Sequence, residues 1–202
     1  EGKEVMARTT LKLDKEKTAE VVQNLLVSHP KLWDLDFPYR YTVETIIKKG
    51  GKTIDKYLTP FGIRSVKFDK DKGFFLNNKH LKLKGMCLHQ DAGCLGTAVP
   101  DRAYERRLLI LKEFGTNAIR CSHNPPSPEF LNYCDSIGFL VIDEAFDKWK
   151  SGYYEEFFDS SWQQDISDMV IRDRNHPSVI LWSIGNELAE AKLKDDTGIE
   201  RA

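Results

Sequence analysis

An Asn-Glu pair, Asn186 and Glu187, directly follows the apolar segment VILWSIG, and it is the part of this sequence best suited to acid/base chemistry. The segment is nearly continuous in hydrophobic residues, which is typical of a strand buried on both faces. A carboxylate at the exit of such a strand loses hydration, which favours the protonated form that a general acid needs. The competing interpretation is that Glu187 only caps a following helix or forms an ion pair with it.

Polar residues also end three other predicted strands. Arg120 and His123 lie in TNAIRCSH, His89 closes LKLKGMCLH with Asp91 two residues later, and Asp143 and Glu144 follow one another in FLVIDEA. Histidine, carboxylate and guanidinium groups at the carboxyl ends of parallel strands are the usual material of a barrel active site. The sequence therefore predicts a site assembled from strand ends that are distant along the chain.

From about residue 79 the hydrophobic pattern alternates between strand and helix. The predicted helices are DRAYERRLLILKEFG, PEFLNYCDSIG and SSWQQDISDMVIRDRN, which begin at Asp101, at Pro128 and behind a serine cap. In the first of them, Leu108, Leu109, Leu111 and Phe114 are expected on the apolar side. Strands alternating with helices predict parallel βαβ units. Because a complete (β/α)8 barrel needs about 250 residues, we expect residues 69–202 to hold the first half of one, with four βα units.

Residues 1–68 have the alternating pattern of an all-β region. VMARTTLKL, AEVVQNLLV, YTVETIIKK and a short stretch before FGIRSV read as strands, with a turn at Gly50 and Gly51. An immunoglobulin-like β-sandwich needs about seven strands in about 100 residues, and four or five are visible. The sequence thus predicts the C-terminal part of such a sandwich over residues 1–68, followed by the barrel domain.

The motifs resemble those of glycoside hydrolase family 2, the family of β-galactosidases and β-glucuronidases. DRNHPSVILWSIGNE is similar to the acid/base signature, and NAIRCSHNPPSPEFLNYCDSIGFLVI to the second signature, except that Asn124 stands where the family usually has Tyr. FFLNNKHLKLKGMCLHQD resembles the entry into the catalytic barrel, and PKLWDLDFPYRYTV with FGIRSV the end of the immunoglobulin-like domain. The resemblance extends over about residues 30 to 187.

This resemblance implies a role for each candidate residue. Glu187 would be the general acid that protonates the leaving oxygen and then the base that activates water, and Asn186 would bind the sugar 2-hydroxyl, unless it is only a helix N-cap. His123 and His89 would line the sugar pocket, with Asp91 as a weaker candidate for substrate binding. Arg120 would orient carboxylates in preference to touching substrate, and Asp143 would anchor neighbouring loops.

In retaining glycosidases a second carboxylate acts as the nucleophile, and in this family it lies at the end of the seventh barrel strand. The resemblance therefore implies a fragment of a retaining exo-β-glycosidase that acts on terminal β-D-galactosides or related β-glycosides and does not turn over alone. The alternatives are a β-glucuronidase fragment and a non-catalytic carbohydrate-binding or scaffold module. The full-length parent is expected to be a homo-oligomer.

The composition narrows the partners. With 30 basic and 31 acidic residues the charge is balanced, so no nucleic-acid or anionic membrane partner is expected. No cofactor and no metal are expected, because Lys148 stands where large bacterial β-galactosidases of the family place magnesium ligands. Free, buried thiols are expected for the cysteines, while the compartment stays open. Aromatic residues after the third barrel strand could stack on sugars or pack under their loop. They are Phe146, Trp149, Tyr153, Tyr154, Phe157 and Phe158.

Overall fold

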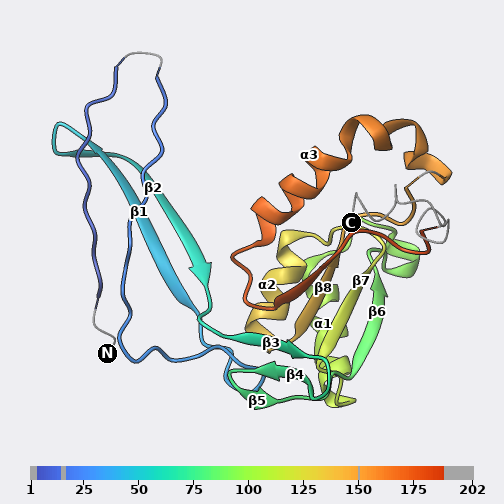
Figure 1. Cartoon of the computed structure of the whole chain (residues 1–202). Coiled ribbons are helices and arrows are strands. Elements are labelled where there is room, and N and C mark those ends of the chain that lie inside the picture. Colours follow the sequence, from blue (N-terminus) through green and yellow to red (C-terminus); the bar gives the residue numbers. More distant parts are fainter. Residues whose placement is uncertain (1–3, 15–16, 150, 189–202) are drawn as a thin grey trace. The chain divides into compact units, whose positions relative to one another are not determined.

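The computed structural model describes residues 4–14, 17–149 and 151–188 (Figure 1). Contacts divide the chain into two units, residues 1–31 and 32–202, and each is described by itself. None of the described helices is long and apolar enough to cross a membrane.

The first unit contains no helix or strand among its described residues. Its two predicted strands, VMARTTLKL and AEVVQNLLV, are therefore wrong as strands. A hydrogen bond from Gln23 Nε2 to Thr9 Oγ1, 3.0 Å long, links the two segments through side chains. Alternating side chains indicate which residues could share a face, but a strand also requires a backbone ladder with a neighbour, and these segments do not form one.

A two-stranded antiparallel hairpin begins the structured part of the second unit. Strands β1 (Tyr41–Lys49) and β2 (Lys52–Phe61) pair from Tyr41 opposite Phe61 to Lys49 opposite Lys52. The intervening Gly50 and Gly51 have φ values of +56° and +80°, the left-handed backbone that a tight hairpin turn requires. The hairpin confirms the predicted strand YTVETIIKK and its turn. The immunoglobulin-like sandwich and its boundary at residue 68 remain predictions.

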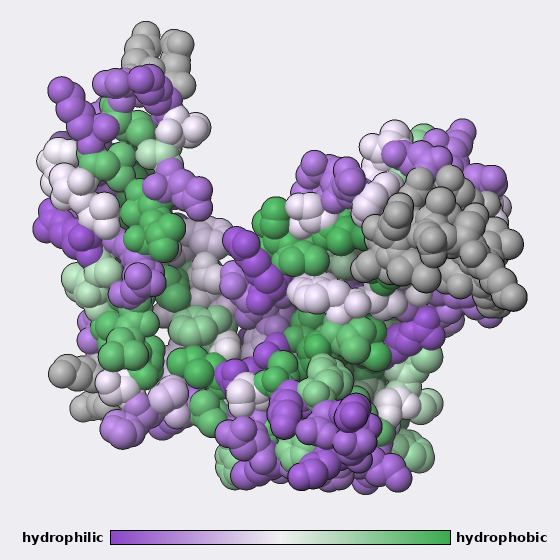
Figure 2. Space-filling view, viewed as in Figure 1, coloured by the Kyte–Doolittle hydropathy of each residue, from purple (hydrophilic) through white to green (hydrophobic). Residues whose placement is uncertain are grey.

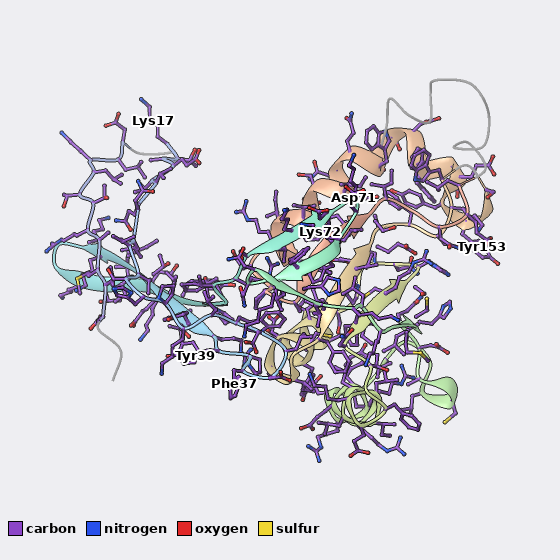
Figure 3. All side chains as sticks on the ribbon, turned by 60° about the horizontal axis from the view of Figure 1, so that its bottom comes forward. Lys17, Phe37, Tyr39, Asp71, Lys72 and Tyr153 are labelled. Carbon is purple, nitrogen blue, oxygen red and sulfur yellow. The ribbon has the colours of Figure 1, made fainter. Side chains whose placement is uncertain are left out.

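A small antiparallel sheet follows, with the strand order β3-β4-β5. Its strands are β3 (Val66–Asp69), β4 (Gly73–Leu76) and β5 (Lys79–His80). Figure 3 shows Asp71 and Lys72 at the turn between β3 and β4, where the backbone N–H groups of both residues donate to Asp69 Oδ1 at 3.1 and 3.0 Å. Phe74 and Leu76 of β4 pack with Trp33 and with the first residues of β7 and β8, so this sheet covers the amino-terminal end of the parallel sheet.

Four parallel strands in the order β6-β7-β8-β9 form the main sheet, as expected for part of a barrel (Figure 1). The strands are β6 (Gly85–His89), β7 (Ala118–Ser122), β8 (Leu140–Glu144) and β9 (Val179–Ser183). The helices between them are α1 (Asp101–Glu113), α2 (Pro128–Ile137) and α3 (Glu155–Asp173). All four predicted strands and all three predicted helices of this region are present.

The helix-facing side of the sheet holds the main hydrophobic core. Ile119 and Val141 from the strands pack there with Leu108 of α1 and Leu131 of α2. The predicted apolar side of α1 is correct for Leu108 and Leu111 but wrong for Leu109 and Phe114, which are exposed. Tyr104 takes their place in the core, four residues before Leu108, because the helical period of 3.6 aligns these positions.

The helix ends show which local signals were decisive. Ser127 caps α2 by accepting a 3.2 Å hydrogen bond from the Phe130 N–H, Pro128 stands at the start, and Gly138 ends the helix with φ of +85°. The serine cap predicted for α3 is wrong, because that helix begins earlier, at Glu155, without a side-chain cap. Packing of Phe158 in a buried aromatic cluster stabilises the additional turn.

Candidate active site

Several of the predicted site residues lie together at the carboxyl end of the parallel sheet. His89 is the last residue of β6, His123 directly follows β7, and Asn186 and Glu187 follow β9. Because the four strands are parallel, their ends lie on the same edge, as the sequence predicts. His89 and His123 are in edge-to-face contact, with ring centroids 5.2 Å apart.

Glu144, the last residue of β8, is the centre of a buried polar network. Its carboxylate is fully buried and accepts hydrogen bonds from Arg120 Nε at 2.9 Å and Arg120 Nη2 at 3.1 Å. Ser183 Oγ donates to it at 2.8 Å, and His123 Nδ1 lies 2.6 Å from Oε1. The paired charges compensate the cost of burying the carboxylate. Since Glu144 engages Nδ1, the other ring nitrogen of His123 is left for a ligand.

Arg120 joins this network to the Asn-Glu pair. Its Nη2 donates to Asn186 Oδ1 at 3.0 Å, and the Asn186 Nδ2 donates to Asp147 Oδ1 at 3.0 Å. Hydrogen bonding to Glu144, the largest cause, raises the pKa of Arg120, so this guanidinium stays charged. Both ends of the Asn186 amide are thereby fixed. A role for Arg120 in orienting carboxylates agrees with these contacts but stays a prediction.

Glu187 lies beside Lys148, whose Nζ donates to Glu187 Oε2 at 3.0 Å. The Glu187 side chain is 73% exposed at the open end of this four-stranded sheet, and the loss of hydration expected at the strand exit stays a prediction. The residue lies three positions beyond Ile184, on a turn where its own φ is +48°, which lifts the side chain away from the buried sheet.

Asp91 and Asp143 lie outside this group. Asp91 is exposed in the turn after β6, where its backbone carbonyl accepts from Arg107 Nη2 at 2.6 Å, and no hydrogen bond joins its side chain to the other candidates among the described residues. Asp143 points to the helix side of the sheet because strand side chains alternate and Glu144 takes the other side. Asp143 therefore does not line the site, and the expected anchoring of loops is not seen in the described part of the chain.

Asp143 is instead a fully buried carboxyl group that lies beside the carboxyl group of Asp173. Burial, followed by the neighbouring Asp173, raises the pKa of Asp143 to about 8, while Arg172 acts in the opposite direction. Arg172 itself is held by Asp173, to which its Nε donates at 2.7 Å. Asp143 therefore keeps its proton over much of the neutral range.

Most aromatic residues of the loop after β8 pack against one another. Phe146 stacks on Tyr154 with centroids 4.9 Å apart, and Trp149 stacks on Phe158 at 5.3 Å. Tyr153 is fully exposed and points away from the sheet in Figure 3, and Phe157 is half exposed. The structure therefore favours packing under the loop over sugar stacking for four of the six residues, namely Phe146, Trp149, Tyr154 and Phe158.

A cavity of about 810 Å³ opens beside this loop. It is bordered by the loops after β7 and β8 and by α3, and its lining includes Asn124, Pro125, Phe146, Lys148, Met169 and Arg172. Lys148 lines this cavity and also donates to Glu187, so one side chain connects the candidate acid/base with a space large enough for a small ligand.

The described residues contain no group of three or more His, Cys, Asp or Glu side chains that could hold a metal ion. All four thiols are free. Cys121 and Cys134 are buried, which raises their pKa. Burial was wrongly expected for Cys87 and Cys94, which are exposed. The absence of a cofactor and of a metal stays a prediction.

The sequence reasoning missed Glu144 as the centre of the site and did not include Asp147, Lys148 or Ser183. A signal for Glu144 existed, since it is two residues beyond Ile142 and so shares the strand face that Ile142 and Arg120 form across β7 and β8. Asp147 and Lys148 follow in an irregular loop, where no periodic pattern predicts in which direction a side chain points.

Comparisons with known proteins show the family to which the chain belongs. Residues 66–197 match the family described as Glycosyl hydrolases family 2, TIM barrel domain, and residues 1–64 match Glycosyl hydrolases family 2. The beta-galactosidase BoGH2A of Bacteroides ovatus is 50% identical over 98% of this chain and 24% of its own length. A beta-glucuronidase of Bacteroides fragilis is 32% identical over 94% of this chain and 29% of its own length.

Solved structures show the same relationship. A glycosyl hydrolase family 2 member from Bacteroides cellulosilyticus superposes with a TM-score of 0.83 at 49% identity, covering 88% of this chain and 23% of that chain. A β-glucuronidase from Ruminococcus gnavus in complex with D-glucaro 1,5-lactone has a TM-score of 0.73 at 33% identity, covering 81% of this chain and 28% of that chain. The chain thus spans about a quarter of the length of these relatives.

Proposed function

Because this chain belongs to glycoside hydrolase family 2, we propose that it supplies the acid/base side of the active site of a retaining exo-β-glycosidase. Glu187 is the general acid of the first step and the general base of the second. The nucleophilic carboxylate comes from a part of a longer polypeptide that these 202 residues do not include.

One observation carries this proposal, namely the connection of the Asn186-Glu187 pair to a buried, fully paired carboxylate. Arg120 contacts both Asn186 and Glu144, and Glu144 also holds His123. An oriented amide at the strand end suits a contact to the sugar 2-hydroxyl, which strengthens in the transition state. His123 and His89 are then placed to contact other hydroxyl groups of the same sugar.

For the substrate we propose a terminal β-D-galactoside. The beta-galactosidase of Bacteroides ovatus, at 50% identity, supports this choice. A β-glucuronide is the second candidate, because the beta-glucuronidase of Bacteroides fragilis also aligns over most of the chain. A non-catalytic carbohydrate-binding module is a third possibility, disfavoured by the intact network around Glu144 and Asn186.

The test uses a polypeptide in which this chain is continued through a complete barrel. Glu187→Gln should lower the rate of the first step by about 10²-fold or more for aryl glycosides with poor leaving groups. It should spare that step for a leaving group of low pKa, which departs without a proton. Parallel assays with β-galactosides and β-glucuronides identify the sugar. Equal losses for activated and unactivated substrates would reject Glu187 as the acid.

The chain by itself should show no turnover, since one carboxylate cannot serve as nucleophile and acid together. The control is the continued polypeptide under the same conditions. If the chain alone reaches about 1 s⁻¹, the rate of an ordinary enzyme, the need for an outside nucleophile is refuted. Asp147 would then be the second carboxylate to replace, because it shares Lys148 with Glu187.

A further inference from the structure

The loop after β8 and the loop after β9 are joined beyond the end of the sheet. The N–H of Ala145 donates to the Ser183 carbonyl at 2.9 Å, and the N–H of Asn186 donates to the Asp147 carbonyl at 3.0 Å. The indole N–H of Trp149 donates to the Ile184 carbonyl at 2.8 Å. These contacts extend the pairing of β8 and β9 as far as the candidate catalytic residues, so the two loops form one structural unit.

Side chains continue this connection. Asp147 Oδ1 accepts from Asn186 Nδ2 at 3.0 Å and from Lys148 Nζ at 3.1 Å, and Lys148 Nζ also donates to Glu187 Oε2 at 3.0 Å. The hydrogen bond from Asn186 is the largest cause that lowers the pKa of Asp147. The bond to Glu187 is the largest cause that raises the pKa of Lys148. We call these two residues the Asp147–Lys148 bridge.

We propose that the Asp147–Lys148 bridge is a positioning device for the acid/base pair, in which Asp147 fixes the Asn186 amide and Lys148 holds the Glu187 carboxylate in its ionised form between the two chemical steps. The proposal rests on the proposed function of Glu187. Neither bridge residue needs to touch the reacting atoms. Both act through the residues that do.

The need for such a device follows from the chemistry, because Glu187 must hold a proton in the first step and be ionised in the second. A cation in contact with a carboxylate opposes its protonation, which assists the base step and hinders the acid step. The effects of removing the cation on the two steps should therefore differ in sign.

The kinetic test compares Lys148→Met with Lys148→Arg in the polypeptide that carries a complete barrel. In Lys148→Met the alkaline limb of kcat/KM should move upward by roughly 0.5 pH unit, because an exposed pair is worth only a fraction of a unit. The base step should slow by up to about 3-fold at pH 5, because a shift of about 0.5 pH unit lowers the ionised fraction of Glu187 by no more than that factor. Lys148→Arg should keep the alkaline limb at its original pH. Lys56→Met, which removes an exposed lysine paired with Glu44 on the hairpin, is the matched control and should change neither.

A second measurement needs no activity and uses the chain itself. Lysine side-chain NMR should show that Glu187→Gln lowers the pKa of Lys148 and leaves that of Lys56 unchanged. For Asp147, replacement by Asn should raise KM for a substrate with a 2-hydroxyl but not for its 2-deoxy analogue, because the misdirected Asn186 amide matters only where the hydroxyl is present.

The outcomes separate the bridge from the proposed function. If Glu187→Gln fails to discriminate leaving groups, the acid/base assignment is wrong and the bridge loses its purpose. If Glu187→Gln does discriminate them, but Lys148→Met leaves the pH limb in place and Lys148 keeps its pKa in Glu187→Gln, the bridge proposal is overturned and the acid/base assignment survives.

Discussion

Asp143 and Glu144 are neighbours on β8 and both are fully buried, but they lie in opposite surroundings. Glu144 faces the site and is held by Arg120, Ser183 and His123. Asp143 faces the helices beside Asp173, and burial and this neighbour together raise its pKa. Burial alone therefore does not define a functional carboxylate. On the site face the charge of Glu144 is compensated by its partners, whereas on the helix face Asp143 avoids a buried charge by keeping its proton.

The largest loss in the free energy of unfolding is expected when the compensated charge of Glu144 is removed. Glu144→Gln leaves Arg120 without its carboxylate, and breaking a buried ion pair costs about 3–5 kcal/mol. Because the Arg120 side chain is 34% exposed, solvent screens part of this cost, and we expect the free energy of unfolding to fall by about 2 kcal/mol. Urea unfolding of the chain measures it.

The control for this change is Glu44→Gln, which breaks the exposed pair with Lys56 on the hairpin. Exposed pairs of this kind contribute less than about 1 kcal/mol. Equal losses in the two variants would show that the network around Glu144 has no special weight, and the comparison with Asp143 would lose its basis.

The next effect concerns Asp143 and depends on pH. Its pKa in the folded chain is about 8, whereas that of an unfolded aspartate is about 3.9. Between these values the folded chain keeps a proton that the unfolded chain has released, so the free energy of unfolding falls as the pH rises. At about 1.36 kcal/mol per pH unit, we expect a loss on the order of 2 kcal/mol from pH 5 to about pH 6.5, and Asp143→Asn should remove this slope. Denaturant titrations of both proteins at several pH values decide it, and identical slopes would mean that Asp143 is ionised throughout.

A smaller effect is expected where one hydrogen bond joins the loops. Trp149→Phe keeps an aromatic ring in the cluster with Phe158 but removes the N–H that donates to Ile184. The loss of a single buried bond should lower the free energy of unfolding by about 1 kcal/mol. Hydrogen exchange at the Asn186 N–H should accelerate too. An unchanged exchange rate would show that the backbone contacts hold the loop without Trp149.

The smallest effect is expected at the surface of the same loop. Tyr153 is fully exposed, so Tyr153→Ser should change the free energy of unfolding by less than about 0.5 kcal/mol. Hydrophobic residues also reach the surface elsewhere (Figure 2), and such single exposures need no function. A loss of substrate affinity in this variant, without a loss of stability, would instead assign Tyr153 to sugar stacking.

The barrel part of the fold was predictable because its signals repeat. Each strand and helix from Gly85 to Ser183 has its own period, and the caps at Ser127 and Gly138 agree with it. The structure of the first 31 residues was not predictable, since alternation alone cannot supply a partner strand. The early start of α3 could not be foreseen either, because the packing of Phe158 replaces a capping residue there.

The position of the site was predictable, but the contacts between its side chains were not. Strand ends located His123, Arg120 and Asn186 on one edge, since parallel strands all end there. The alternation along β8 separates Glu144 from Asp143, but which of the two faces the site depends on the register with β7, in which Arg120 lies opposite Ile142. The turn at Glu187, with φ of +48°, could not be foreseen, because no hydrophobic pattern records it.

The assignment of Glu187 as the acid/base is tested most directly by azide added to Glu187→Gln in the polypeptide with a complete barrel. With an activated β-galactoside, the glycosyl-enzyme should accumulate, because water cannot attack it without the base. Azide needs no base, so it should restore turnover by about 10-fold or more and yield the β-galactosyl azide with retained configuration. Absence of both rescue and azide product, with the glycosyl-enzyme not accumulating, would contradict the assignment.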